Sequence, residues 1–198
     1  MTETIVFDLP PVISENDLRD ALLRLPRWRL SKALKYRKTV DRFLCAKAYL
    51  LLEEGLERLY GIKGPLEFEC SPTGKPSLAG HGDIHFNLSH CHSCVCCIIS
   101  DGPVGIDVED IGFDRGLAEG VCSAKELQCV LSAEDPAIEF TRLWTCKESF
   151  LKLTGQGLRD DMKPVLDACN CEFKTTVNKE GGYVLTTARH DNNVITNL

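Results

Sequence analysis

Residues 83–110, "DIHFNLSHCHSCVCCIISDGPVGIDVED", decide the fold of this chain, because they contain three strand patterns joined by short turns. In the first pattern Ile84, Phe86 and Leu88 alternate with polar residues, which is the period of a half-buried strand. The apolar run "CVCCIIS" follows as a second strand. The residues "DGP" at 101–103 then make a hairpin-like turn into a third strand, "VGIDVED". The centre of the chain is therefore predicted to form a sheet.

Helices are predicted on both sides of these strands. Apolar residues recur at helical spacing over 40–60, and Gly61 is expected to end that helix. A similar pattern over 137–154 is followed by Gly155, and 114–131 is also predicted to be helical. Short strands are expected at "EFEC", "CEFKTTV" and "GGYVLTTAR", and a loop at "SPTGKPSL". Helices and strands mix without a βαβ rhythm, so the predicted class is α+β, with each half packing one long helix on a small sheet.

The composition is that of a folded protein without a membrane span. At 198 residues and 43% apolar, the chain can bury one core, or two cores of about 100 residues each. The N-terminus lacks the basic and apolar segments of a secretory signal, and no stretch approaches the roughly 18 apolar residues that cross a bilayer. We therefore expect a cytoplasmic protein that does not bind membranes. The net charge of −6 argues against nucleic-acid binding.

The cysteines of residues 85–100 raise the alternatives of a zinc site or a disulfide cluster, because four cysteines and three histidines occur there. The chain has eleven cysteines, an odd number, and the cytoplasm keeps thiols reduced. Cys96 and Cys97 are consecutive and face opposite sides of a strand, which keeps both from joining one metal site. Cys122 and Cys129 stand apart on a predicted helix, without zinc-finger spacing. We expect the cysteines to act as small apolar residues, and a cysteine-rich zinc or redox protein is the alternative.

Basic residues gather in one segment of this acidic chain. Residues 24–47 contain nine Lys or Arg and one acidic residue, a local charge of +8. One interpretation is the solvated face of a helix. On a protein with a net charge of −6, the cluster also indicates an anionic ligand or partner.

The strand "VGIDVED" carries two carboxylates on one face. Asp107 and Glu109 lie two residues apart, so their backbones are separated by about 7 Å and their side chains can converge on one ion. Oxygen ligands favour a hard cation such as Mg²⁺. Gly105 on the same face has no side chain and is expected to leave room for a ligand to approach. The alternative is the exposed edge of an ordinary strand.

Other polar residues could share such a site. Glu148 and Lys152 lie one turn apart on a predicted helix, where they could form a surface ion pair. Alternatively, Glu148 completes a metal site begun by Asp107, and Lys152 reaches the oxygens of a metal-bound phosphate. Lys75 on a Gly-Pro loop and His90 at a strand end are further potential phosphate donors, although a lone histidine is more often structural.

Three motifs occur in one order along the chain: "GKP" with "FNLSH", then "VGIDVE", then "WTCKESFLKLTGQGL". This succession resembles the Sfp-type 4′-phosphopantetheinyl transferase family, over roughly residues 26–160. The family pattern has a Gly-Lys-Pro loop, a Phe-Asn-Leu/Ile-Ser-His strand, a Gly-Ile-Asp-Ile/Val-Glu strand and a Trp-x-x-Lys-Glu-Ala/Ser-x-x-Lys helix. The segment "CSAKE" also resembles a short family segment that ends in Glu.

The resemblance implies roles for the motif residues. Asp107, Glu109 and Glu148 resemble the Mg²⁺ ligands, with Mn²⁺ as an alternative ion. Glu148 also resembles the base that deprotonates the attacking serine, and Lys152 resembles the catalytic lysine on the coenzyme A pyrophosphate. The other implied coenzyme A-binding positions are Arg42, Lys75, Pro76, Ser89 and His90. Lys147 belongs to the motif, but the resemblance gives it no clear role.

The family reaction implies the partners and the architecture. A serine of an apo carrier protein, acyl or peptidyl, attacks the β-phosphate of coenzyme A, and 3′,5′-ADP leaves. Family members of this length are monomers with two similar α+β halves, related by a pseudo-two-fold axis, and an active site in the cleft between them. The implied halves are 1–103, on the coenzyme A phosphate and adenine side, and 104–198, on the metal-binding side. A catalytically silent coenzyme A-binding relative would be expected to lack a metal carboxylate or Lys152, and all of these residues are present.

Overall fold

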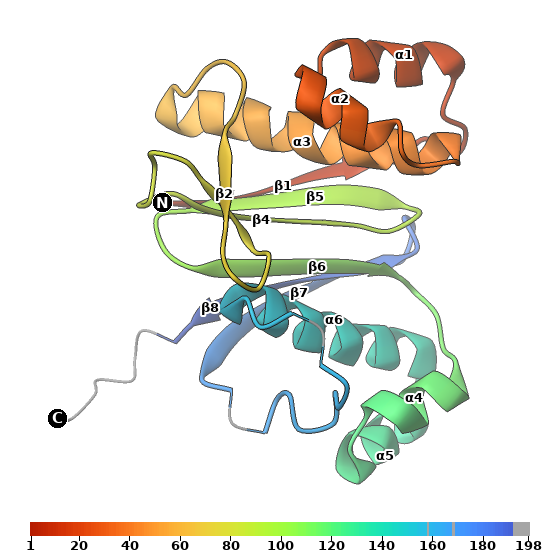
Figure 1. Ribbon diagram of the computed structural model, residues 1–198. Helices are drawn as coiled ribbons and strands as arrows, with labels where there is room; N and C mark the ends of the chain where they lie inside the picture. Colours follow the sequence, from red (N-terminus) through yellow and green to blue (C-terminus); the bar gives the residue numbers. More distant parts are fainter. Residues whose placement is uncertain (158, 168, 192–198) are drawn as a thin grey trace, which may run out of the picture.

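The computed structural model describes residues 1–157, 159–167 and 169–191, so the end of the expected 104–198 half lies outside the described residues. Two three-stranded antiparallel sheets lie at its centre, between the long helices α3 and α6 (Figure 1). The first part of the chain comprises β1 (Thr2–Asp8), α1 (Glu15–Leu23), α2 (Arg27–Ala33), α3 (Thr39–Tyr60), β2 (Phe68–Cys70), β3 (Pro76–Leu78), β4 (His85–His90) and β5 (Cys94–Ser100). The second part comprises β6 (Val104–Asp110), α4 (Arg115–Val121), α5 (Ala124–Ser132), α6 (Pro136–Thr154), β7 (Cys171–Asn178) and β8 (Tyr183–His190). The predicted α+β class is confirmed.

The two three-stranded sheets repeat one arrangement. The first has the strand order β1–β5–β4 and the second has the order β6–β8–β7, so the last strand of each part lies in the middle of its sheet. In each part the α-helices come between the first strand of that sheet and the other two. This repetition agrees with the expected pair of similar α+β halves.

The two long helices begin and end close to the predicted positions. Helix α3 ends at Gly61, whose φ of 69° places it in the left-handed region that favours glycine. Helix α6 begins after Asp135, whose side chain accepts hydrogen bonds from the backbone N–H groups of Ala137 and Ile138. It ends at Gly155, which also has a φ of 69°. Local capping therefore fixes the length of the helix that carries Glu148 and Lys152.

The single helix predicted over 114–131 is wrong, because the structure has two helices there. Helix α4 ends at Val121, and Ser123 starts α5 with a capping box in which it exchanges hydrogen bonds with Glu126. The spacing of Ser123 and Glu126 in "CSAKE" is itself the signal for this new start. The loop expected at "SPTGKPSL" also contains a short strand, β3, which pairs with β2.

Strand β5 is buried on both faces, which explains the cysteine-rich sequence. Cys97 belongs to the core under α3, whereas Cys94 and Cys96 belong to a core shared with Ile106 of β6 and Leu185 of β8. The prediction that Cys96 and Cys97 face opposite sides is confirmed. All eleven cysteines lie within the described residues and are free thiols. Small apolar side chains allow a helix and a second sheet to pack closely on the two faces of one strand.

The two sheets meet along the edge strands β4 and β6, which lie side by side (Figure 1). Side chains of β4 reach across this junction. The side-chain oxygen of Asn87 accepts a hydrogen bond of 3.2 Å from the backbone N–H of Ile106, and Ser89 donates one of 2.9 Å to Asp107. The position of β6 is thus tied to that of β4. Among the described residues, no helix is long and apolar enough to cross a membrane.

Candidate active site

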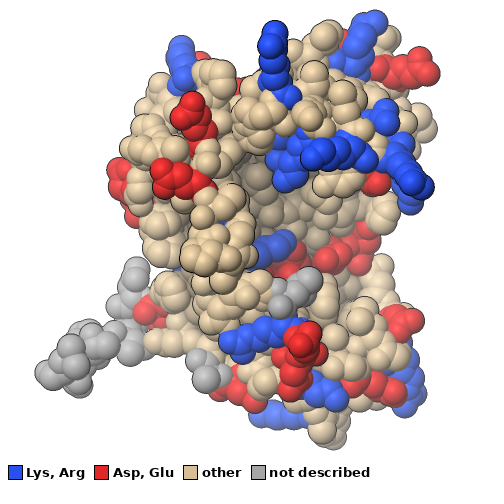
Figure 2. Space-filling view, viewed as in Figure 1, with Lys and Arg blue, Asp and Glu red and all other residues tan. Residues whose placement is uncertain are grey.

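A cavity opens where the two halves meet, and most of the predicted site residues line it. Figure 2 shows this hollow, with acidic side chains inside it and basic side chains gathered above it. Residues from α2, α3, β3, β4, β6 and α6 contribute to the lining, as does Tyr36 after α2. The polar and charged lining residues are Arg29, Lys32, Tyr36, Ser89, His90, Asp107, Glu109, Trp144, Glu148 and Lys152.

Lys152 is held between the two halves by Asp107 and Ser89. Its ammonium group donates a hydrogen bond of 2.6 Å to Asp107 Oδ1 and one of 2.9 Å to Ser89 Oγ. Ser89 in turn donates to the same Asp107 oxygen. The Asp107 side chain is 3% exposed and that of Lys152 is 29% exposed, so the pair is anchored in the protein while the ammonium group stays accessible from the cavity. The sequence predicted this convergence of Asp107 and Lys152, but it did not predict that Ser89 would accept a hydrogen bond from Lys152 and donate one to Asp107.

The three predicted carboxylates line the same cavity, where burial and the charge of Asp107 disfavour the ionised forms of Glu109 and Glu148. Burial and the neighbouring Asp107 raise the pKa of Glu109 to about 7, although a hydrogen bond from Trp144 opposes this shift. Burial and Asp107 also raise the pKa of Glu148, against the opposing charge of Lys152. Carboxyl groups whose pKa values are raised in this way are typical of sites that bind cations or transfer protons.

A metal ion is compatible with these donors, although their side chains would have to move. As they stand, the side chains of residues 1–157, 159–167 and 169–191 contain no group of three or more His, Cys, Asp or Glu that could hold a metal ion. Two carboxylate oxygens nevertheless lack a partner: Asp107 Oδ2 and Glu148 Oε1 are buried and make no hydrogen bond within the described chain. Unpaired buried carboxylate oxygens are costly, and a hard cation would satisfy them. The donor set therefore fits Mg²⁺.

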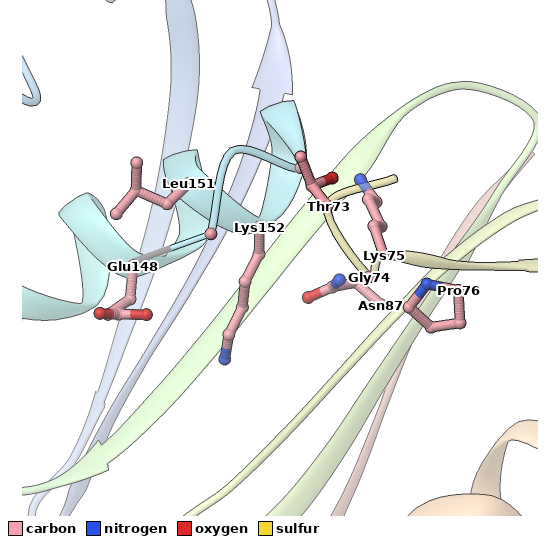
Figure 3. A pocket seen from close by; sticks show the side chains of 10 residues that line it. Thr73, Gly74, Lys75, Pro76, Asn87, Glu148, Leu151 and Lys152 are labelled. Atoms are coloured by element: carbon pink, nitrogen blue, oxygen red, sulfur yellow. The ribbon is translucent and has the colours of Figure 1, made fainter. Parts of the chain in front are cut away.

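The Lys75 loop closes one side of an adjoining cavity, which shares Pro76, Glu148 and Lys152 with the first (Figure 3). Lys75 Nζ donates a hydrogen bond of 2.8 Å to the carbonyl of Leu153, near the end of α6. Burial lowers the pKa of Lys75. Lys75 thus lies at the predicted cleft but is bonded to the protein, and its predicted contact with coenzyme A stays a prediction.

His90 and Arg42 differ in their relation to the cavity. The His90 ring lines the cavity, and desolvation together with the nearby Lys152 lowers its pKa. Arg42 is absent from the described lining, and its Nε donates a hydrogen bond to the carbonyl of Tyr36 instead. Two basic residues that the sequence analysis did not single out, Arg29 and Lys32, line the cavity. Both lie on α2, within the basic segment 24–47, which was the available signal.

Lys147, whose role the sequence left open, is a buried structural residue. Its ammonium group is fully buried and bonds to Glu126 Oε2 at 2.9 Å. It also donates to the backbone carbonyls of Val121, Met162 and Lys163, at 3.0, 2.8 and 3.1 Å. Lys147 therefore joins α6 to the start of α5 and to the segment after α6. It points away from the cavity that its neighbour Glu148 lines.

The expectation that Gly105 leaves room for a ligand is wrong, because helix α6 fills that space. A Cβ atom at Gly105 would overlap the backbone carbonyl of Ser149 and lie 2.6 Å from the backbone N of Leu153. The missing side chain lets α6 approach β6 closely, and this contact brings Glu148 and Lys152 up to Asp107.

Replacing Gly105 by alanine is therefore expected to push α6 away from β6. We expect the free energy of unfolding to fall by about 1–3 kcal/mol, because backbone atoms cannot yield as flexible side chains do. Urea unfolding measures this loss. Gly120→Ala is the matched control, since nothing lies within 4 Å of the added Cβ and alanine favours the helix. Equal stability of the two variants would contradict the close packing.

Several known proteins similar to this chain are named 4'-phosphopantetheinyl transferases. The model of the "4'-phosphopantetheinyl transferase superfamily" matches residues 103–193. The chain is 37% identical over 132 residues to 4'-phosphopantetheinyl transferase psf-1 of Bacillus pumilus, covering 64% of this chain and 56% of the relative. It is 30% identical over 162 residues to 4'-phosphopantetheinyl transferase gsp of Aneurinibacillus migulanus, covering 80% and 68%. It is 32% identical over 113 residues to 4'-phosphopantetheinyl transferase Sfp of Bacillus subtilis, covering 55% and 50%.

The chain belongs to the 4′-phosphopantetheinyl transferase superfamily, and it is of the Sfp type that its motifs predicted. The matches span about half to two thirds of the length of these relatives.

Proposed function

We propose that this chain transfers the 4′-phosphopantetheine group of coenzyme A to a serine of an apo acyl or peptidyl carrier protein, releasing 3′,5′-ADP. The observation that carries the proposal is the meeting of Asp107, Glu109 and Glu148 with Lys152 in one cavity between the two halves. Phosphoryl-transfer sites usually combine carboxylates that bind a metal ion with a lysine that binds phosphate oxygens. The similarity to 4′-phosphopantetheinyl transferases supports the same reaction.

The phosphates of coenzyme A would bind to the basic side of the cavity. Lys152 would donate to the pyrophosphate oxygens, while Asp107 and Ser89 keep its ammonium group in place. Arg29 and Lys32 lie in the same cavity, and Arg29 Nε is buried without a hydrogen-bond acceptor among the described residues. A phosphate oxygen would satisfy this donor. Pro76 lines both cavities, and His90 would be a further donor to the phosphates.

Glu148 is the proposed base. Its Oε1 atom is buried and unpaired in the described structure, and the raised pKa of this carboxyl makes its ionised form a better proton acceptor than an exposed glutamate. It would take the proton of the carrier serine as the serine oxygen attacks the β-phosphate. The P–O bond to the 3′,5′-ADP moiety then breaks, and 3′,5′-ADP leaves with the bonding electron pair.

Asp107, Glu109 and Glu148 are the residues that would hold Mg²⁺, with Mn²⁺ as an alternative. The bound ion would offset the negative charge that develops on the phosphates. The cavity is lined by both parts of one chain, so a second copy is not needed to complete it, and we propose a monomer. The expected cytoplasmic location stays a prediction.

Intact mass of a carrier protein tests the proposed reaction. An apo carrier incubated with this protein, coenzyme A and Mg²⁺ is expected to gain one phosphopantetheine. Removal of divalent ions with EDTA should abolish the gain, and added Mg²⁺ should restore it, because the carboxylates would lose the ion that offsets the phosphate charge. Transfer that persists unchanged in EDTA would contradict the metal requirement.

Two alternatives predict different results. A catalytically silent relative would bind coenzyme A but would modify neither fatty-acid carriers nor peptide-synthase carriers. A cysteine-rich zinc protein would contain one equivalent of zinc after purification. The burial of Cys94, Cys96 and Cys97 between packed layers argues against the second alternative.

A further inference from the structure

The carboxylate of Asp110, at the end of β6, binds the turn that follows His90. Asp110 Oδ2 accepts a hydrogen bond of 3.0 Å from the backbone N–H of His92, and Oδ1 accepts one of 3.1 Å from that of Ser93. The His92 ring also contacts Oδ2, with its Nδ1 at 3.0 Å. Both carboxylate oxygens are thus used by one short turn. Asp110 has no place in the reaction described above, although it directly follows Glu109.

The turn is held from its other side as well. The carbonyl of Ser93 accepts a hydrogen bond of 2.8 Å from the backbone N–H of Leu9, just after β1. The N–H of Cys91 bonds to the carbonyl of Cys94 at 3.0 Å, and His90 pairs with Val95 in the ladder between β4 and β5. These hydrogen bonds therefore hold the backbone from His90 to Ser93 in place. Asp110 adds polar contacts from the second half, beside the apolar packing of Cys91 and Cys94 against β6 and β8.

We propose that Asp110 is a positioning residue, which fixes the turn after β4 and thereby holds the His90 ring in the wall of the anion-binding cavity. This inference rests on the proposed function, because it assigns His90 to a phosphate of coenzyme A. His92 and Ser93 present two consecutive backbone N–H groups, a concave arrangement that suits an anion, and here the anion is the Asp110 side chain. Asp110 lies on the same strand as Asp107 and Glu109. By binding the turn after His90, it also fixes the position of His90 relative to those two carboxylates.

The test is a double-mutant cycle between Asp110 and His90. Affinity for 3′,5′-ADP is measured by calorimetry, and KM and kcat are measured with coenzyme A and an apo carrier. Asp110→Ala is expected to weaken 3′,5′-ADP binding and raise the KM for coenzyme A by about 10-fold, the cost of losing charge-assisted hydrogen bonds. The kcat should change by less than about threefold, because the carboxylates and Lys152 stay in place. In a His90→Ala background, Asp110→Ala should have no further effect on either quantity.

Two further variants make the result specific. Asp110→Asn keeps one acceptor oxygen and should lie between the wild type and Asp110→Ala, even if Asp110→Ala proves too unstable to purify. His92→Ala removes the ring contact and keeps the backbone N–H; because the His92 side chain is 88% exposed, binding should stay near the wild-type value.

Several outcomes would overturn the inference. Additive effects of Asp110→Ala and His90→Ala would show that Asp110 does not act through His90. A lower kcat and melting temperature with unchanged KM would show a merely structural role. A wild type that binds no 3′,5′-ADP would remove the phosphate contact of His90 on which the inference rests. If the wild type modifies no carrier yet the two residues are coupled in 3′,5′-ADP binding, the proposed function fails and the role of Asp110 stands.

Discussion

Replacing Glu148 by glutamine is expected to reduce carrier modification by about 10³-fold, the usual contribution of a general base. Glutamine has nearly the same shape as glutamate, but it cannot accept the serine proton or hold a cation with the same strength. Glu148 lines the cavity and bonds to no described residue through Oε1, so the fold should not depend on its charge. Intact mass of the carrier over time measures the rate, and calorimetry checks that 3′,5′-ADP still binds.

A control on the same helix separates the effect of losing the proposed base from the effect of losing a negative charge. Glu139→Gln removes another carboxylate of α6, which pairs with Arg142 outside the cavity. We expect the Glu139 variant to transfer phosphopantetheine at nearly the wild-type rate. A Glu148→Gln variant that is folded and as active as this control would exclude Glu148 as the base.

Replacing Lys147 by methionine is expected to lower the free energy of unfolding by about 3–5 kcal/mol, the usual cost of breaking a buried ion pair. Methionine fits the space, but it removes the ammonium donor from three backbone carbonyls and from the Glu126 carboxylate, which keeps its hydrogen bond from the backbone N–H of Ser123. Because the stability of a whole domain is about 5–15 kcal/mol, this loss would be a large fraction of the total. Urea unfolding followed by circular dichroism gives the value.

Lys125→Met is the matched control for Lys147. Lys125 is an exposed lysine one residue before Glu126, so its loss should change the free energy of unfolding by less than about 0.5 kcal/mol. A Lys147→Met variant as stable as Lys125→Met would show that the four hydrogen bonds contribute little. Lys147 would then need another explanation for its place beside Glu148.

The elements with strong local signals were predicted well from the sequence. Helices α3 and α6 have apolar periodicity and glycine ends, and the strands around "FNLSH" and "GIDVE" alternate clearly. Strand β1 was missed because only Ile5 and Phe7 alternate toward the core, and Val6 between them weakens the pattern. Its formation depends on pairing with β5, almost 100 residues away, and a local pattern does not show such a partner.

Site residues were predicted correctly where a motif specified both the type of each residue and its spacing along a strand or helix. Asp107, Glu109, Glu148 and Lys152 meet as expected. The errors concern what only tertiary packing decides. Gly105 faces a helix rather than a ligand, and Arg42 turns to the Tyr36 carbonyl while Arg29, on the preceding helix, reaches the cavity. In a segment with nine basic residues, the sequence gives the charge but not the direction in which each side chain points.

Because β5 is buried on both faces, the reactivity of its thiols would show which layer of the protein opens. Burial strongly raises the pKa values of Cys96 and Cys97, so neither thiol should react with an alkylating reagent while its layer is closed. Cys97 would become reactive when α3 lifts from its sheet, and Cys96 when the two sheets separate. Alkylation followed by peptide mapping would therefore measure the rates of these two openings separately in the native protein, without any introduced label.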